Sequence, residues 1–119
     1  MQEQRQFVRL DTRLNITYQV ASGAAVSSVT KDIGGGGICV FLNEVLQPGT
    51  SLRIEIQVLD RPKPIAFLGE VAWCDSYEVI GRGQRERSIE AGVKFMQIDP
   101  QDRQTILQHV ILGLQAPSQ

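Results

Sequence analysis

The sequence has few of the residues that most often carry catalysis or hold metal ions. Its 119 residues include a single histidine, His109, and two cysteines, Cys39 and Cys74. The cysteines are far apart, and the sequence contains neither a CxxC pair nor a Cys/His spacing typical of metal sites. We therefore expect no metal site and predict reduced thiols in or near the core. A disulfide between the two cysteines is the alternative.

A large net charge and a long apolar run are also missing. The formal net charge is −1, so the molecule as a whole lacks the positive field that favours a nucleic-acid polymer. Any anion site must therefore come from a local cluster of arginines. No apolar run approaches 18 residues, and the N-terminus shows no signal-peptide pattern. The length and composition predict one cytoplasmic domain without membrane insertion.

The residue sets that would indicate an enzyme are absent as well. His109 lies on a predicted terminal helix at the edge of its apolar stripe, where a boundary histidine is more common than a general base. The glycines at 34–37 are not followed by the Lys-Ser/Thr of a phosphate-binding loop. Carboxylates are scattered over turns and polar strand faces: Asp11, Glu44, Glu55, Glu70, Glu78 and Glu90. With no nucleophile–base pair, the sequence favours a binding domain over an enzyme, with no catalytic residues and no cofactor.

Alternation of apolar and polar residues runs through most of the chain. Such alternation is typical of strands with one buried face. Turn residues separate these runs, and six short strands joined by polar turns predict an all-β antiparallel barrel or sandwich. The predicted strands are 14–20, 26–30, 37–42, 52–58, 65–73 and 89–95.

One segment near the C-terminus changes to a helical period. Asp99 followed by Pro100 is typical of a helix start, with Asp99 as the N-cap and Pro100 as the first helical residue. An apolar stripe at helical spacing follows. We expect a helix over about residues 100–113 that packs across one face or end of the barrel.

Arginines recur at every fourth position near the N-terminus, as Arg5, Arg9 and Arg13. Three interpretations remain open: a solvated arm, a basic arm for nucleic acid, and a clamp for a small phosphorylated ligand. The guanidinium fork suits the last two, because it holds phosphate oxygens with two parallel hydrogen bonds and also pairs with guanine. Phe7, between the first two arginines, is a candidate anchor for the arm.

A second basic cluster spans residues 81–87, with arginines at 82, 85 and 87. It falls between two predicted strands, so we expect an extended hairpin tip. A solvated loop is the simpler interpretation, and a second anion contact is the alternative.

Four consecutive glycines, Gly34–Gly37, stand in the stretch KDIGGGGICV. Each glycine inside a regular element costs about 0.5–1 kcal/mol relative to alanine. A run of four therefore indicates a position where the backbone serves a special purpose.

Together, these motifs resemble the PilZ domain family, over about residues 5–113. The family combines an N-terminal RxxxR motif with a later [D/N]xSxxG motif. RQFVR at residues 5–9 matches the first, although residues 9–13 also fit it. DIGGGG at residues 32–37 matches the second at its Asp and its last Gly, with Gly34 in place of the serine. GEVAW at 69–73 and GVKF at 92–95 resemble later strands of the family.

The resemblance implies a six-stranded antiparallel barrel with one C-terminal α-helix that binds cyclic di-GMP. It divides the chain into a flexible arm (1–13), a barrel with its helix (14–114) and a tail (115–119). Arg5 and Arg9 would hold phosphates and guanine edges, and Asp32 would accept hydrogen bonds from guanine. Gly34–Gly37 would form the ligand-facing turn, with Gly37 allowing a tight backbone path. Gln4, Gln6 and Arg13 are accessory candidates.

Two departures from the family pattern bear on function. Glycine at position 34 cannot supply the serine hydroxyl, which lowers affinity by about threefold to tenfold if one hydrogen bond is lost. Gln4 stands where some members have a further arginine that helps to bind a ligand dimer, so we expect one ligand per domain.

The predicted function is a cyclic di-GMP effector whose arm is ordered by the ligand and which signals to a protein partner, with homodimerisation as an option. The alternative is a PilZ-like barrel that has lost its ligand and serves only as an interaction module. A nucleic-acid-binding barrel is a further rival, which predicts strongly salt-dependent binding to long strands.

Overall fold

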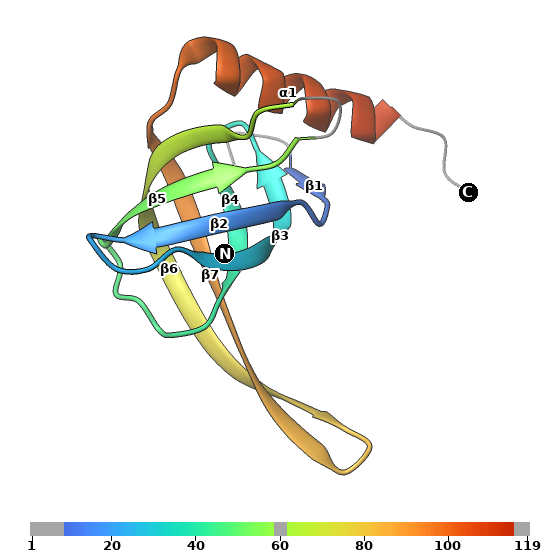
Figure 1. The fold of residues 1–119 in the computed structure, drawn as a ribbon. Coiled ribbons are helices and arrows are strands. Elements are labelled where there is room, and N and C mark those ends of the chain that lie inside the picture. The colour runs from blue at the N-terminus through green and yellow to red at the C-terminus, as the bar shows by residue number, and fades with distance from the viewer. Residues whose placement is uncertain (1–8, 59–61, 116–119) are drawn as a thin grey trace, which may run out of the picture.

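The computed structural model describes residues 9–58 and 62–115, and side chains are described as far as Leu112. In this part of the chain, the fold consists of seven strands and one helix (Figure 1). The strands are β1 (Arg9–Asp11), β2 (Asn15–Val20), β3 (Val26–Gly34), β4 (Gly37–Leu42), β5 (Ser51–Ile56), β6 (Ile65–Gly81) and β7 (Gln84–Gln97). The helix is α1 (Pro100–Gln115).

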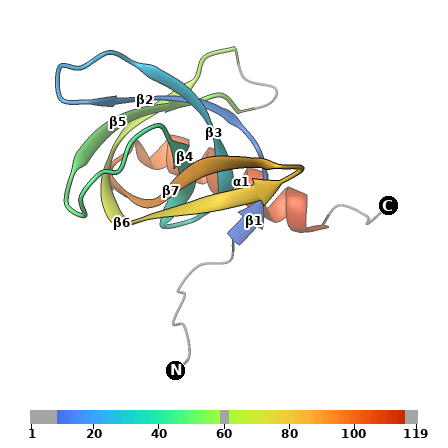
Figure 2. The same cartoon turned by 90° about the horizontal axis from the view of Figure 1, so that it is seen from below.

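Six of these strands form a closed antiparallel barrel. The hydrogen-bonded order runs β3-β2-β5-β6-β7-β4, and β4 pairs with β3 to complete the ring. Figure 2 shows the barrel nearly end-on, with the strands curving around a common interior. The seventh strand, β1, is added to the edge of β3 beside β2. The predicted six-stranded barrel is thus confirmed, with one additional short strand.

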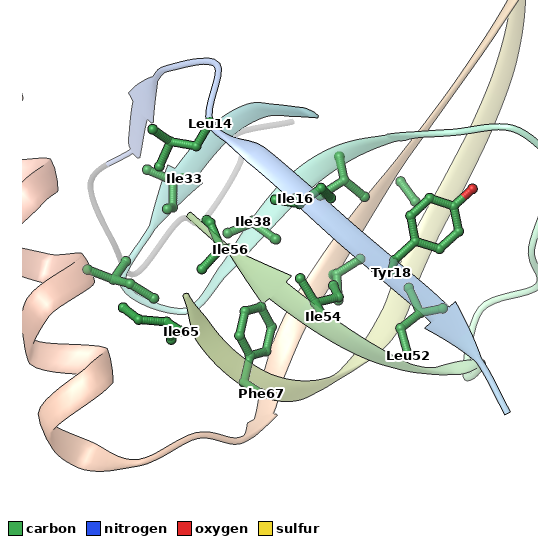
Figure 3. Packing of buried hydrophobic residues seen from close by; sticks show 14 of the residues in the cluster. Leu14, Ile16, Tyr18, Ile33, Ile38, Leu52, Ile54, Ile56, Ile65 and Phe67 are labelled. Atoms are coloured by element: carbon green, nitrogen blue, oxygen red, sulfur yellow. The ribbon is translucent and has the colours of Figure 1, made fainter. Parts of the chain in front are cut away.

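The barrel interior is filled by the apolar residues that alternate along each strand. Ile54 and Ile56 on β5 are fully buried, and the polar residues between the inward-facing positions are more exposed. Figure 3 shows side chains from β2, β5 and β6 converging on this interior. Phe67 and Phe95 meet edge to face, with ring centroids 4.8 Å apart. Alternation in the sequence therefore becomes burial because one face of every barrel strand points inward.

Helix α1 closes one end of the barrel. The Asp99 side chain accepts a hydrogen bond from the backbone N–H of Gln101 (2.8 Å), and its carbonyl accepts one from Arg103 N–H (3.0 Å). These bonds confirm the predicted N-cap. Ile106 and Val110 are buried against the barrel, and the helix contacts β1 and β3. Among the described residues, no helix has the length and apolar character needed to span a membrane.

The described part of the predicted N-terminal arm is bound to the barrel. Residues 9–11 form β1, in which Arg9 lies opposite Gly34 and Asp11 opposite Asp32. The buried Thr30 hydroxyl donates to Thr12 O (2.6 Å) and accepts from Leu14 N–H (2.9 Å), so it joins the segment between β1 and β2 to β3. Residues 1–8 of the predicted arm and the tail at 116–119 lie outside the described residues.

Strands β6 and β7 are much longer than the sequence predicted. They contain 17 and 14 residues, and their pairing continues to a turn at Arg82-Gly83. Both turn residues have positive φ, 42° and 79°, which is typical of a tight type I′ turn. The resulting hairpin projects beyond the barrel at the end opposite α1 (Figure 1). The extended hairpin tip predicted at 81–87 is therefore confirmed, and all of its residues are exposed to solvent.

Candidate functional site

A cleft of about 210 Å³ opens on the outer surface of the barrel, where the glycine run meets β6 and β7. Its walls come from five strands: β1, β3, β4, β6 and β7. The lining residues are Arg9, Asp32, Gly36, Gly37, Ile38, Cys39, Ala72, Trp73, Gly92, Val93 and Lys94. The structure thus brings four of the predicted site residues together: Arg9, Asp32, Gly36 and Gly37.

Arg9 and Asp32 form a partly buried ion pair at this cleft. Arg9 Nε donates to Asp32 Oδ1 at 2.6 Å, and Arg9 Nη2 lies 2.5 Å from the same oxygen. Arg9 Nη2 also lies 3.5 Å from the Gly37 carbonyl oxygen. The two side chains are only 23% and 17% exposed. Burial strengthens such a charge-assisted bond, so the guanidinium is held in a fixed orientation before any ligand arrives.

A β-bulge explains why Asp32 faces outward. The pairing of β3 with β4 shifts register between Thr30 and Asp32, while Thr30 and Ile33 both point into the core. The extra residue, Lys31, allows two consecutive side chains to leave the interior. Lys31 Nζ then pairs with both carboxylate oxygens of Glu90 at 3.1 Å. The bulge therefore places the Asp32 carboxylate at the cleft, and the preceding residue, Lys31, is anchored to Glu90 on β7.

The glycine run has two different structural roles. Gly34 ends β3 and Gly35 is buried, and the Gly35 carbonyl accepts a hydrogen bond from Arg103 Nε of α1 at 3.0 Å. Gly36 and Gly37 line the cleft, and the Gly36 carbonyl accepts the Phe95 N–H at 3.0 Å. Gly34 and Gly35 are thus adjacent to the cleft without lining it.

Close packing of backbones explains the glycine at position 37. A Cβ on Gly37 would lie 2.2 Å from Val93 O and 2.9 Å from Lys94 Cα, both of them backbone atoms of β7. Within the described ranges, the glycines with positive φ are Gly49 and Gly83, so the run at 34–37 does not serve a left-handed turn. The tight backbone path expected at Gly37 therefore lies against β7.

The sequence interpretation missed the cleft wall formed by β6 and β7. Trp73 packs against Gly92, where an added Cβ would lie 2.2 Å from the indole Nε1. Trp73 is 41% exposed and lines the cleft. Lys94 lies opposite Glu70 on the neighbouring strand, and their side chains pair at 3.2 Å. The motifs at 69–73 and 92–95 were the available signal, but only closure of the barrel brings them to the glycine run.

The buried thiol of Cys39 gives the cleft an unreactive floor. Burial is the main cause that raises the pKa of Cys39 to about 12, and the nearby carboxylates of Asp32 and Glu90 add to it. The thiol therefore stays protonated at neutral pH and is a poor nucleophile. Both cysteines are free, as the sequence predicted. In the described part of the chain, no three His, Cys, Asp or Glu side chains gather closely enough to hold a metal ion.

The other residues proposed from sequence lie elsewhere. Arg13 donates to the Lys31 carbonyl at 2.6 Å and its guanidinium stacks over Phe41, 5.5 Å from the ring centroid. It therefore does not line the cleft. The arginines at 82, 85 and 87 lie at or near the hairpin tip, about 17–30 Å along the strands from Trp73. Arg5, Gln4 and Gln6 fall outside the described residues.

The arrangement of the cleft suits a planar, anionic ligand. Arginine and lysine cations, backbone amides of the glycine run and a carboxylate acceptor lie beside an exposed indole surface. A comparison with protein-family profiles finds the PilZ domain over residues 3–112. The chain belongs to the PilZ domain family. PilZ domains are ligand-binding effector domains, which agrees with the prediction that this chain is not an enzyme.

Solved structures with the same fold come from several bacterial proteins. The PilZ domain with c-di-GMP of YcgR from Escherichia coli has a TM-score of 0.76 and 14% identity, covering 95% of this chain and 93% of that one. MotI/DgrA, an inhibitor of motility from Bacillus subtilis, has a TM-score of 0.70 and 24% identity. MrkH, described as a c-di-GMP-dependent transcription regulatory factor, has a TM-score of 0.76 and 16% identity.

The chain spans about half of two of these proteins, since it covers 52% of the MotI/DgrA chain and 52% of the MrkH chain. Identities this low establish a shared fold, while the family assignment rests on the profile match. No curated protein sequence matches the chain significantly.

Proposed function

We propose that the chain binds cyclic di-GMP in the cleft between the glycine run and Trp73. The observation that carries this proposal is the fixed Arg9–Asp32 pair at a cleft that is also bordered by an exposed indole. A cyclic dinucleotide presents two phosphates and two flat bases. Arginine, a carboxylate and an aromatic surface are the groups that bind phosphates, guanine edges and base faces.

Each residue has a distinct role in the proposed complex. Arg9 holds a phosphate or a guanine edge, and Asp32 accepts hydrogen bonds from guanine N–H groups. Trp73 offers its exposed surface to a base, and Lys94 of the neighbouring strand β7 adds a positive charge. Arg5 is proposed as a second phosphate ligand, because it completes the RxxxR motif with Arg9.

Ligand binding is proposed to order residues 1–8 over the cleft. These residues directly precede β1, whose first residue is Arg9. A phosphate held by both Arg5 and Arg9 would connect the preceding segment to the barrel. The protein would then act in the cytoplasm by presenting a changed surface to a partner protein.

The alternative is an interaction module that no longer binds the ligand. Gly34 favours it, because this position has no hydroxyl and the residue is buried. The Arg9–Asp32 pair argues against it, because both side chains proposed to bind the ligand are present and oriented. Binding is therefore the function we favour.

Isothermal titration calorimetry with purified protein and cyclic di-GMP tests the proposal. The parent protein should release or absorb heat with about one ligand bound per domain. Arg9→Ala and Asp32→Ala should each weaken binding by about tenfold to hundredfold, since a hydrogen bond to a charged group contributes about 1.5–3 kcal/mol.

Arg13→Ala is the matched control for Arg9→Ala. It removes an arginine from the second RxxxR register, and its guanidinium stacks on Phe41 outside the cleft. Its affinity should stay within twofold of the parent. No heat up to high micromolar ligand, with all variants indistinguishable from the parent, would favour the interaction module instead.

A further inference from the structure

The hairpin of β6 and β7 carries exposed apolar side chains that the proposed ligand site does not use. Beyond the barrel, Tyr77 is 41% exposed and Val79 is 48% exposed. Both lie on the same face of β6 as Trp73, opposite Ser88 and Glu86 of β7. Figure 1 shows that this part of the hairpin stands clear of the rest of the fold. The row continues from the ligand cleft towards the hairpin tip.

Tyr77 is held in place by a network that reaches back to the cleft. Its hydroxyl donates to Glu90 Oε2 at 3.0 Å, and Glu90 is in turn paired with Lys31. Lys31 directly precedes Asp32 in the bulge of β3. A fixed aromatic side chain loses little conformational entropy when a partner covers it, and tyrosine and tryptophan are enriched at interface hot spots.

Acidic side chains flank this apolar row. Asp75 lies between Trp73 and Tyr77 on β6, and Glu86 lies opposite Val79. Among the described residues, neither Asp75 nor Glu86 has an ion-pair partner. The opposite face of the hairpin carries Arg85, Arg87 and Ile80, together with Glu78 opposite Arg87. The two faces of one hairpin therefore differ in the sign of their net charge.

We infer that the outer hairpin face, defined as Asp75, Tyr77, Val79 and Glu86, docks a protein segment that carries Lys or Arg around an apolar side chain. The apolar side chain would cover Tyr77 and Val79. The cations would pair with the two carboxylates and stack on the tyrosine ring. The inference deepens the proposed function, because it names the surface through which ligand binding reaches a partner.

The charges of this face disfavour the two other candidate occupants. A nucleic acid would bring phosphates against Asp75 and Glu86, which repel them. A second copy in a two-fold dimer would place the same face against itself and so bring like carboxylates together. A basic protein segment is the occupant that neutralises both groups.

Site-specific photo-cross-linking in cells that naturally encode the protein tests this assignment. The full chain would carry p-benzoylphenylalanine in place of either Val79 or Ile80. Ile80 is the matched control, because it is the next residue, is 73% exposed and lies on the opposite face. A discrete protein adduct should form from position 79 at least fivefold more than from position 80. Mass spectrometry should place the cross-link next to Lys or Arg in the captured segment.

Charge removal gives a second, independent readout. The double variant Asp75→Asn/Glu86→Gln should reduce the adduct at least threefold, whereas Arg85→Gln should leave it unchanged. Equal adducts from positions 79 and 80, no adduct, an adduct of two copies of this chain or one insensitive to the double variant would each overturn the inference.

Calorimetry on the same charge variants separates this inference from the proposed function. The double variant should bind cyclic di-GMP like the parent, since neither residue lines the cleft. Loss of the adduct with intact ligand binding supports the docking surface. If this chain forms the adduct but never binds cyclic di-GMP, the docking surface is supported and the ligand proposal is overturned.

Discussion

Strands β6 and β7 form two regions of opposite character from one continuous hairpin. Within the barrel, Val71 and Val93 are almost fully buried, and Gly69 and Gly92 lie in contact with neighbouring side chains. Beyond the barrel, the same two strands keep their pairing, but Val79 is 48% exposed and a Cβ added to Gly81 would meet nothing within 4 Å. Both regions thus keep their backbone hydrogen bonds, whereas only the region within the barrel is closely packed.

This comparison shows which part of the hairpin can change. Where β7 is enclosed by β4 and β6, its side chains and backbone fix the geometry of the proposed ligand cleft. Where the hairpin is free, only the turn and the pairing are constrained. The barrel region therefore suits a fixed ligand site, and the projecting region suits a surface whose residues can be adapted to a partner.

The largest contrast should be in thiol reactivity. Raising the pKa of Cys39 from 9.0 to about 12 lowers its thiolate fraction at pH 8 roughly a thousandfold. In the folded protein, iodoacetamide at pH 8 should therefore modify Cys74, which is half-buried where the hairpin leaves the barrel, and leave Cys39 unmodified. Peptide mass spectrometry measures both sites, and labelling in urea is the control. Equal labelling of the two cysteines in the folded protein would contradict the burial of the Cys39 thiol beneath the cleft.

The next largest contrast should come from replacing one glycine by alanine in each region. Gly37→Ala places Cβ 2.2 Å from the Val93 carbonyl oxygen, and a backbone atom of the barrel cannot move aside cheaply. We expect the free energy of unfolding to fall by about 3 kcal/mol. Gly81→Ala, on the projecting hairpin, should change it by less than about 0.5 kcal/mol. Urea unfolding measures both, and similar effects would show that β4 does not pack against β7 as described.

Truncation of two valines on one strand gives a smaller contrast. Val71 is 1% exposed and Val79 is 48% exposed, and both lie on β6. Val71→Ala should lower the free energy of unfolding by about 2 kcal/mol, from lost burial and a residual cavity. Val79→Ala should cost less than about 0.5 kcal/mol in the isolated protein. If Val79→Ala proved as destabilising as Val71→Ala, the outer hairpin face would be part of the core and not a docking surface.

The smallest predicted effect concerns the serine that is missing from the glycine run. Gly34→Ser supplies a hydroxyl beside Asp32 and should tighten cyclic di-GMP binding by about threefold to tenfold. Gly81→Ser on the hairpin is the control and should leave the affinity unchanged. Calorimetric titration compares the two, with thermal unfolding to verify that each variant is folded. Unchanged affinity in Gly34→Ser would mean that position 34 makes no contact with the ligand.

The barrel was predictable because burial on one face leaves a period of two in the sequence. Ile54 and Ile56 illustrate this, and so does the capped start of α1 at Asp99. The projecting half of the hairpin left no such signal, since beyond the barrel neither face of residues 75–81 is buried. The three-residue strand β1 was also missed, because it is too short to show a period.

The candidate site was predictable only where its residues are close in sequence or form a motif. Asp32 and the glycine run belong to one stretch, and Arg9 belongs to the RxxxR motif. Trp73 and Lys94 reach the same cleft only because β4 pairs with β7 when the barrel closes. The bulge that turns Asp32 outward depends on the register between two strands, which the sequence of one strand does not determine.

Fluorescence of the single tryptophan tests the central claim most directly. Trp73 is the only tryptophan in the chain, and it forms a wall of the proposed ligand cleft. Titration with cyclic di-GMP should change its emission saturably in the parent protein and in Arg13→Ala, with a midpoint shifted at least tenfold in Arg9→Ala. Emission that stays constant up to high micromolar cyclic di-GMP would contradict ligand binding at this cleft.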